Sequence, residues 1–211
     1  MTKRRSTREH LLNTGAMIAS ESGLRGLTVR GLSLRAGTNP GSFVYHFGNR
    51  DAFLNELLER WYEPLFTGVR THANVHLPSL KKLEIILEDI MDFLLLHGEF
   101  IAQLVLDALA GEKEAIRFIS GLHTRHPFVL LETIQAAQEE GSIVSGNPMN
   151  VLSYLVCCGG APFILSGQLQ VHDSQAARPV LELLGSILSD PDSARQRMHW
   201  ALNGIREGER T

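Results

Sequence analysis

The sequence contains few cysteines, few aromatic residues and a modest share of charged ones. Among 211 residues there are two cysteines, 7% aromatic residues and 20% charged residues. Two cysteines exclude a disulfide-stabilised scaffold. The hydrophobic share of 44% and the mean hydropathy of -0.02 exclude a disordered or collagen-like chain. We therefore expect a folded globule with a core of its own.

The two cysteines, Cys157 and Cys158, are neighbours in an apolar stretch and lack a CxxC spacing. Adjacent residues are too close together for ordinary disulfide geometry. We expect both thiols to be reduced, buried and structural.

No apolar run in the chain is long enough to predict a transmembrane helix. The segment Gly141–His172 carries no charged residue, but its apolar part, Val151–Leu165, falls short of the roughly 20 residues that a membrane span needs. A helix buried in a core or in a subunit interface explains it better. The N-terminus is polar and basic, unlike a signal peptide, so we expect a cytoplasmic protein.

Acidic side chains are scarce in the first quarter of the chain. Residues 1–50 hold eight basic and two acidic side chains, whereas the remainder holds 12 basic and 21 acidic ones. This split predicts an N-terminal part that meets a polyanion and a C-terminal body that does not. A basic, solvated N-terminal tail is the alternative.

The spacing of apolar residues is helical nearly throughout, with no sustained alternation of period two. The sequence therefore predicts an all-α fold of about nine or ten helices. Pro64 is expected to bend or end a helix that starts at Arg50, and Gly98 to separate two helices. A loop is predicted at His72–Pro78, and a shorter helix at Ala176–Leu188.

The stretch from Thr28 to Arg50 has the pattern of a helix-turn-helix. Two short helices flank a tight turn at Gly37–Asn39, and Thr28 is a good N-cap for the first of them. Reading a major groove requires small residues at the leading end of the second helix, which residues 39–42 supply. Tyr45, His46 and Arg50 follow as donors to phosphate, together with basic residues near the N-terminus: Arg4, Arg5 and Arg8.

Residues Arg8–Leu54 resemble the DNA-binding domain of TetR/AcrR-family transcriptional regulators. The resemblance covers about a quarter of the chain and is more specific than a generic helix-turn-helix pattern. The matching residues are Leu11, Leu12, Gly23, Thr28, Ala36, Gly37, Gly41, Tyr45, His46, Phe47, Arg50 and Phe53.

The resemblance implies roles in DNA binding for individual residues. Thr28 would bond a phosphate, and Arg30 would reach a guanine edge. Pro40 and Val44 depart from the family pattern, which often has lysine and tyrosine there, so fewer phosphate contacts and a shallower salt dependence are expected. Val44 could instead pack on a thymine methyl group. The full set of expected DNA-binding residues is Thr28, Arg30, Thr38, Asn39, Pro40, Gly41, Ser42, Val44, Tyr45, His46 and Arg50.

The resemblance also implies a homodimer and a small-molecule effector. The DNA-binding domain would occupy residues 1–50, and the ligand-binding and dimerisation domain residues 51–211. Dimer contacts are expected from Asn147–Ser166 and Pro191–Ile205, and a near-palindromic operator follows from two-fold symmetry. Candidate effector-binding residues, which could equally be core side chains, are Trp61, Phe66, Phe93, His97, Gln103 and Phe118.

Two other classes of function stay open from the sequence. One is an all-α ligand-binding protein without DNA binding. The other is a metalloenzyme built on the pairs His72/His76 and His123/His126, although no third ligand is evident. No catalytic, nucleotide or dinucleotide motif is present, so we predict neither an enzyme nor a cofactor nor a metal.

Overall fold

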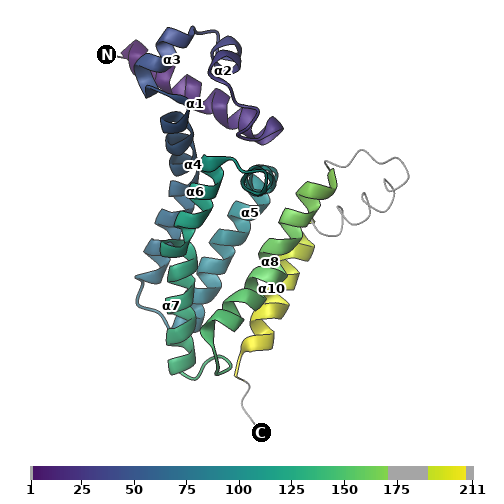
Figure 1. Ribbon diagram of the computed structural model, residues 1–211. Helices are drawn as coiled ribbons and strands as arrows, with labels where there is room; N and C mark the ends of the chain where they lie inside the picture. Colours follow the sequence, from purple (N-terminus) through teal and green to yellow (C-terminus); the bar gives the residue numbers. More distant parts are fainter. Residues whose placement is uncertain (1, 171–189, 208–211) are drawn as a thin grey trace, which may run out of the picture. The chain divides into compact units, whose positions relative to one another are not determined.

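The computed structural model describes residues 2–170 and 190–207, with side chains described for 7–162 and 190–207. Helices make up almost all of this part of the chain (Figure 1). Within it there is no strand, and the only β feature is an isolated antiparallel bridge between Ile143 and Arg206. The predicted all-α class is confirmed.

The chain divides into two compact units. Unit 1 comprises Met1–Pro64 and Glu99–Gly121, and unit 2 comprises Leu65–Gly98 and Leu122–Thr211. These units interleave along the sequence. The functional boundary expected at residue 50 stays a prediction.

Unit 1 begins with α1 (Thr2–Ser22), α2 (Val29–Arg35) and α3 (Pro40–Phe47), which pack together (Figure 1). It continues with the first part of α4 (Arg50–Ala73). The last part of α5 (Ser79–Leu109) and α6 (Lys113–Gly121) complete it.

The core of unit 1 is aromatic and places α3 against α4. Phe43 and Phe47, one helical turn apart on α3, both contact Phe53, with ring centroids 5.3 and 4.8 Å from it. Helix α1 approaches the same ring through Gly15, where a Cβ atom would lie 2.5 Å from Phe53 Cζ. A larger residue at position 15 would separate α1 from this cluster.

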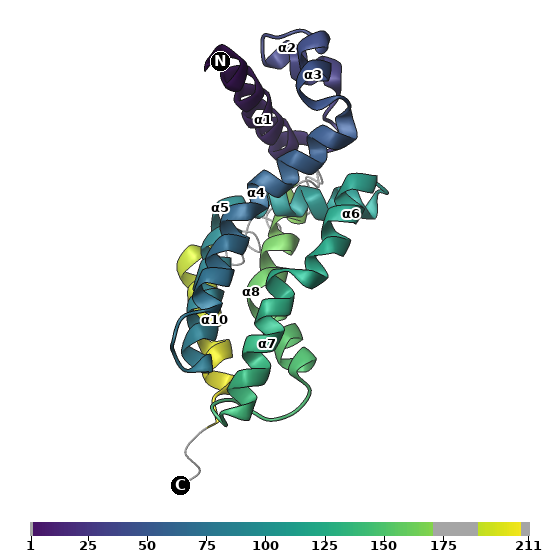
Figure 2. The same ribbon diagram turned by 90° about the vertical axis from the view of Figure 1, so that its left-hand side faces the viewer.

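Unit 2 is built on α7 (His126–Glu139), α8 (Pro148–Gln170) and α10 (Pro191–Ile205), preceded by a short 3₁₀ turn at Leu122–Thr124. Helix α8 packs beside α7 (Figure 2) and beside α10 (Figure 1). The Asn147 and Asp190 side chains accept hydrogen bonds from the first-turn amides of α8 and α10, at 2.9 and 2.8 Å. Both starts are as expected for a cap followed by proline.

Two expected helix ends do not occur. Pro64 does not end its helix, because α4 continues to Ala73 and the predicted loop starts two residues later; Gly98 does not separate two helices, because α5 runs through it. Pro64 is exposed, so water can reach the carbonyl group that loses its partner, and buried side chains on both sides, such as Leu58 and Val69, hold the helix. Pro64 and Gly98 each lie at a boundary between the units. The predicted helix Ala176–Leu188 lies outside the described residues.

The apolar helix α8 exposes more of its surface than the sequence predicts. Both cysteines are free, but Cys157 is exposed and Cys158 is half-buried, so the expectation that both are buried is wrong. The reason is that Cys157 lies on an exposed part of α8, next to the exposed Val156. In the described part of the chain no single helix is long and apolar enough to cross a membrane. Two segments joined at a sharp bend, Ser79–Leu109 and Lys113–Glu139, together have the length and composition of a span.

His126, the first residue of α7, makes the stability of unit 2 depend on pH. Burial, with a smaller contribution from Arg125, lowers the pKa of His126 from 6.5 to about 4. Between these values the unfolded chain binds a proton that the folded protein does not, so stability falls as the pH drops from 6.5 to 4. We expect a loss of up to about 3 kcal/mol over this window, measured as the urea midpoint at a series of pH values.

The matched comparison is His126→Gln against His76→Gln, because His76 is an exposed histidine of the same unit. The first variant should flatten the acid limb of the stability curve and the second should leave it unchanged. Equal acid limbs in both variants would contradict the assignment to His126.

Candidate nucleic-acid interface

Helices α2 and α3 and the turn between them form a helix-turn-helix. Gly37, at φ +61°, adopts the left-handed conformation that lets the chain reverse after α2. Thr38 then donates a hydrogen bond from its amide to the Ser33 carbonyl at 2.9 Å. This turn confirms the prediction that two short helices meet at residues 37–39.

Two of the predicted DNA-binding residues are also helix caps. Thr28 Oγ1 accepts a hydrogen bond from the Gly31 amide at 3.1 Å, and Asn39 Oδ1 accepts one from the Ser42 amide at 2.8 Å. Each cap uses the side-chain oxygen as an acceptor. The Thr28 hydroxyl and the Asn39 NH₂ group can therefore still donate hydrogen bonds to a ligand. A phosphate oxygen, which accepts hydrogen bonds only, suits the Thr28 donor, and an acceptor atom on a base edge suits the Asn39 donor.

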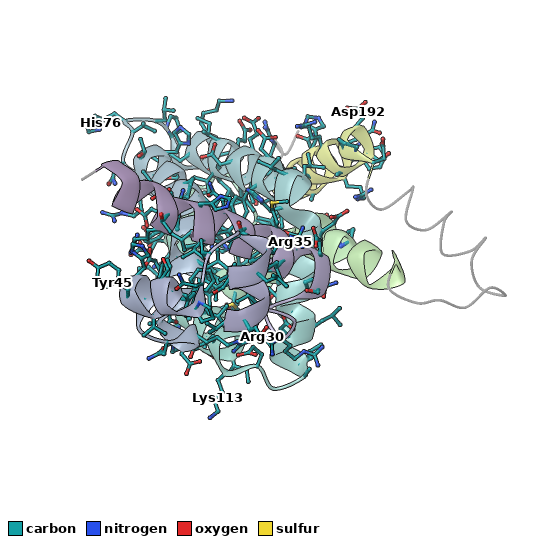
Figure 3. The ribbon with its side chains drawn as sticks, turned by 90° about the horizontal axis from the view of Figure 1, so that it is seen from above. Arg30, Arg35, Tyr45, His76, Lys113 and Asp192 are labelled. Carbon is teal, nitrogen blue, oxygen red and sulfur yellow. The ribbon has the colours of Figure 1, made fainter. Side chains whose placement is uncertain are left out.

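Helix α3 has one buried face and one exposed face. Phe43 and Phe47 are buried, whereas Val44 and Tyr45 are 55% and 60% exposed. In Figure 3 the Tyr45 side chain points away from the helices. Pro40 and Gly41 at the start of the helix are exposed as well. The residues expected to contact DNA therefore share the face of α3 that the unit 1 core does not use.

The arginines near this surface differ in how they are engaged. Arg30 on α2 is exposed and bonds to no described residue. Arg35, on the same helix, makes a double hydrogen-bonded ion pair with Glu21. Arg8 pairs with Glu56 at 2.5 Å and lies 5.3 Å from the centre of the Phe47 ring. Among these three, Arg30 is therefore the arginine best placed to bind a partner.

Arg50 directs its guanidinium inward. Its Nε and Nη2 atoms donate to the carbonyl groups of Leu27 and Leu24 at 2.8 and 2.6 Å, and it forms an ion pair with Glu112 at 3.0 Å. The hydrogen bond from Arg50 lowers the pKa of Glu112. This arrangement favours a role in holding the loop before Thr28 over the phosphate contact that the family resemblance implies.

Sequence reasoning missed Asp107, which holds the same loop. Its side chain is 2% exposed and accepts hydrogen bonds from the Leu24 amide at 2.5 Å and from Arg25 Nε at 3.0 Å. Gly23, at φ +72°, leaves room for it, because a Cβ there would lie 2.7 Å from Asp107 Oδ2. The available signal was that Asp107 is the one charged residue in the apolar run from Phe100 to Leu109.

The predicted effector-binding residues fall in both units. In unit 1, Trp61 contacts Phe100 and Phe118, with ring centroids 4.4 and 6.3 Å apart; Gln103 also lies in this unit. In unit 2, Phe93 and His97 form a ring pair at 4.5 Å, and burial lowers the pKa of His97. Phe66 is also in unit 2, and the Arg70 guanidinium carbon lies over its ring, 5.6 Å from the ring centre. Their role stays a prediction.

The histidine pairs do not gather metal ligands. His72 lies in the last turn of α4, and its Nδ1 is 2.6 Å from Asp89 Oδ2. Within the described ranges, no group of three or more His, Cys, Asp or Glu side chains could hold a metal ion.

Comparison with known proteins identifies the N-terminal residues. Residues 11–57 match the model of the bacterial regulatory proteins of the tetR family. The chain is 26% identical over 141 residues to the HTH-type transcriptional repressor KstR2 of Rhodococcus jostii (strain RHA1), covering 65% of this chain and 68% of the relative. It is 33% identical over 79 residues to KstR2 of Mycobacterium tuberculosis (strain ATCC 25618 / H37Rv), covering 37% and 40%.

Solved structures with the same fold extend over nearly the whole chain. The SmeT–triclosan complex has a TM-score of 0.70 at 15% identity and covers 97% of this chain and 93% of its own. The ketosteroid transcriptional regulator KstR2 of Mycobacterium tuberculosis has a TM-score of 0.67 at 20% identity, with 95% of both chains covered.

The helix-turn-helix, its exposed recognition face and these matches lead to one assignment. Residues 11–57 are similar to the DNA-binding part of the tetR family of bacterial regulatory proteins, and the chain is a DNA-binding transcriptional regulator.

Proposed function

We propose that this regulator is a cytoplasmic homodimeric repressor that binds a near-palindromic operator and is released by a small molecule. The observation that carries the DNA-binding part is the division of α3 into a buried Phe43/Phe47 face and an exposed face with Val44 and Tyr45. A helix anchored on one side and exposed on the other is what insertion into a major groove requires.

Base recognition is assigned to Arg30 and to the exposed start of α3. An unpaired guanidinium can make a bidentate contact with guanine, and Val44 offers an apolar contact for a thymine methyl group. Thr28, Tyr45 and His46 are assigned to phosphates, which fix the register without reading the sequence.

The dimer interface is assigned to α8 and α10. The faces of these helices turned away from the rest of unit 2 expose large apolar side chains: Met149 at 50%, Val156 at 50% and Trp200 at 61%. Exposed apolar side chains on neighbouring helices are typical of a subunit interface built from two helices of each protomer. Two-fold symmetry would place two recognition helices about one DNA turn apart, roughly 34–36 Å.

Release by an effector requires that the small molecule bind one arrangement of the dimer better than the other, since equal affinity for both would shift nothing. The aromatic contacts of Trp61 with Phe100 and Phe118 supply apolar surface of the kind that lines small-molecule pockets. We assign the effector to the helical body on this basis.

Fluorescence anisotropy with DNA from upstream of the chain's own gene tests the proposal. We expect preferential binding over scrambled DNA, with affinity that falls linearly on a log–log salt plot. Arg30→Ala should cost about 1–3 kcal/mol on the operator and relax the choice of one base pair.

Arg35→Ala is the matched control, because Arg35 is on the same helix but is paired with Glu21. It should change operator binding much less than Arg30→Ala. Absence of binding to any DNA at low salt would overturn the proposed function, and equal effects of the two variants would overturn the role of Arg30.

A further inference from the structure

A groove of about 560 Å³ lies between α5 and α10 in unit 2. Its volume is within the range of small-molecule sites, roughly 300–1,000 Å³. None of the predicted effector-binding residues lines it. Its apolar lining consists of buried residues from the two helices: Leu87, Met91, Met198 and Leu202.

These apolar residues form the floor of the groove, and Gly159 on α8 lies beneath it. A Cβ atom at position 159 would collide with the terminal methyl group of Met198 and lie 3.2 Å from that of Met91. The two methionine ends therefore occupy space that any other residue at position 159 would fill. A side chain there would push them toward the groove.

The side chains that line the groove include three carboxylates and two guanidinium groups. Arg206 pairs with Glu84 at one end, and Arg195 pairs with Asp92 at 2.9 Å at the other. Glu88 lies between Glu84 and Asp92 on the same face of α5, one helical turn from each.

Glu88 is exposed, and within the described part of the chain no cation forms an ion pair with it. Lys81 Nζ, outside the groove lining, is bonded to Glu84 at 2.8 Å; this hydrogen bond raises the pKa of Lys81, and the charges of Glu84 and Glu88 raise it further. His199, which also lines the groove, hydrogen-bonds Asn203 at 2.8 Å. Glu88 is thus the lining carboxylate that makes no direct ion pair, and it lies between two that do.

We propose that this groove binds an organic cation with an apolar, preferably aromatic, body. Glu88 pairs with the positive charge, and the methionine floor receives the apolar part. Methionine thioethers make favourable contacts with aromatic rings and adapt to irregular shapes. A purely apolar ligand would leave Glu88 desolvated without a partner, and an anion would be repelled by it. None of its residues belongs to the predicted DNA surface or to the predicted effector set. Its α10 residues fall within Pro191–Ile205, the range assigned to the dimer, on the side of α10 that faces α5.

Tetraphenylphosphonium and tetraphenylborate form a suitable pair of probes, because they have nearly the same shape and opposite charges. Calorimetric titration of the full chain without DNA should show that the phosphonium binds at least fivefold more tightly than the borate. Glu88→Gln should weaken phosphonium binding about fivefold, as expected for one partly exposed ion pair. Glu132→Gln, the same change at an exposed glutamate of α7, should leave it unchanged.

Methyl labelling of the five methionines locates the site. The Met91 and Met198 methyl signals should shift on addition of the phosphonium, and Gly159→Ala should weaken the binding of both probes by crowding the floor. Equal affinity for the two ions, unchanged binding by Glu88→Gln, or shifts that spare Met91 and Met198 would each overturn the proposal. Because no DNA is present, none of these outcomes depends on the proposed repressor function.

Discussion

Replacing Asp107 by alanine should destabilise the protein by about 2 kcal/mol, because the Leu24 amide is left buried without an acceptor and Arg25 loses its partner. For a chain of this size the melting temperature should fall by roughly 4–8 °C. The melting temperature of Asp107→Asn should fall less, because the amide oxygen can still accept the hydrogen bond from Leu24 although the charge is lost. Circular dichroism during thermal unfolding measures both changes.

The control is Glu21→Ala, which removes an exposed partner of Arg35 and should cost less than about 1 kcal/mol. An independent test of the same contact is Gly23→Ala. That change introduces a Cβ at φ +72° against the Asp107 carboxylate and should destabilise as strongly as the loss of the carboxylate itself. If Asp107→Ala and Glu21→Ala had equal effects, the Asp107 contacts would contribute no more than a surface pair.

Arg50→Ala should weaken binding to every DNA sequence by about tenfold while leaving the salt dependence unchanged. The reason is that Arg50 uses its guanidinium on Leu24, Leu27 and Glu112, so its loss releases the loop that leads into Thr28 without removing a phosphate contact. Affinity measured against salt concentration separates these two effects, because each lost phosphate contact lowers the slope by about one.

Glu112→Gln provides the comparison, since it removes the ionic partner and leaves the two carbonyl contacts of Arg50 in place. It should show a smaller loss of affinity and the same slope. A slope reduced by about one in Arg50→Ala, but not in Glu112→Gln, would show instead that Arg50 contacts a phosphate, as the family resemblance implies.

The local features of the fold follow from the sequence. Thr28, Asn39 and Asp190 cap helices in the structure as their positions predict, because a cap depends only on residues within one turn. Gly37 likewise closes its turn through a conformation that few other residues adopt.

Features set by long-range packing could not be predicted in the same way. The contact of Asp107 with the Leu24 amide joins residues 83 positions apart. The inward direction of the Arg50 side chain is also set by long-range packing, because a sequence does not show which carbonyl groups surround a side chain. The exposed face of α3 was predictable, since it is what remains after Phe43 and Phe47 are buried.

The capping role of Asn39, combined with the base-reading role proposed for it, would limit how this regulator can evolve a new binding preference. Asn39 stabilises the start of α3 and also lies where bases would be read, so replacing it to suit another operator would remove a cap worth about 0.5–2 kcal/mol. Val44 has no such structural task, being exposed on the same helix. Divergence in target sequence should therefore accumulate at Val44 before it reaches Asn39, and a library randomised at both positions should recover folded variants mainly with Asn39 retained.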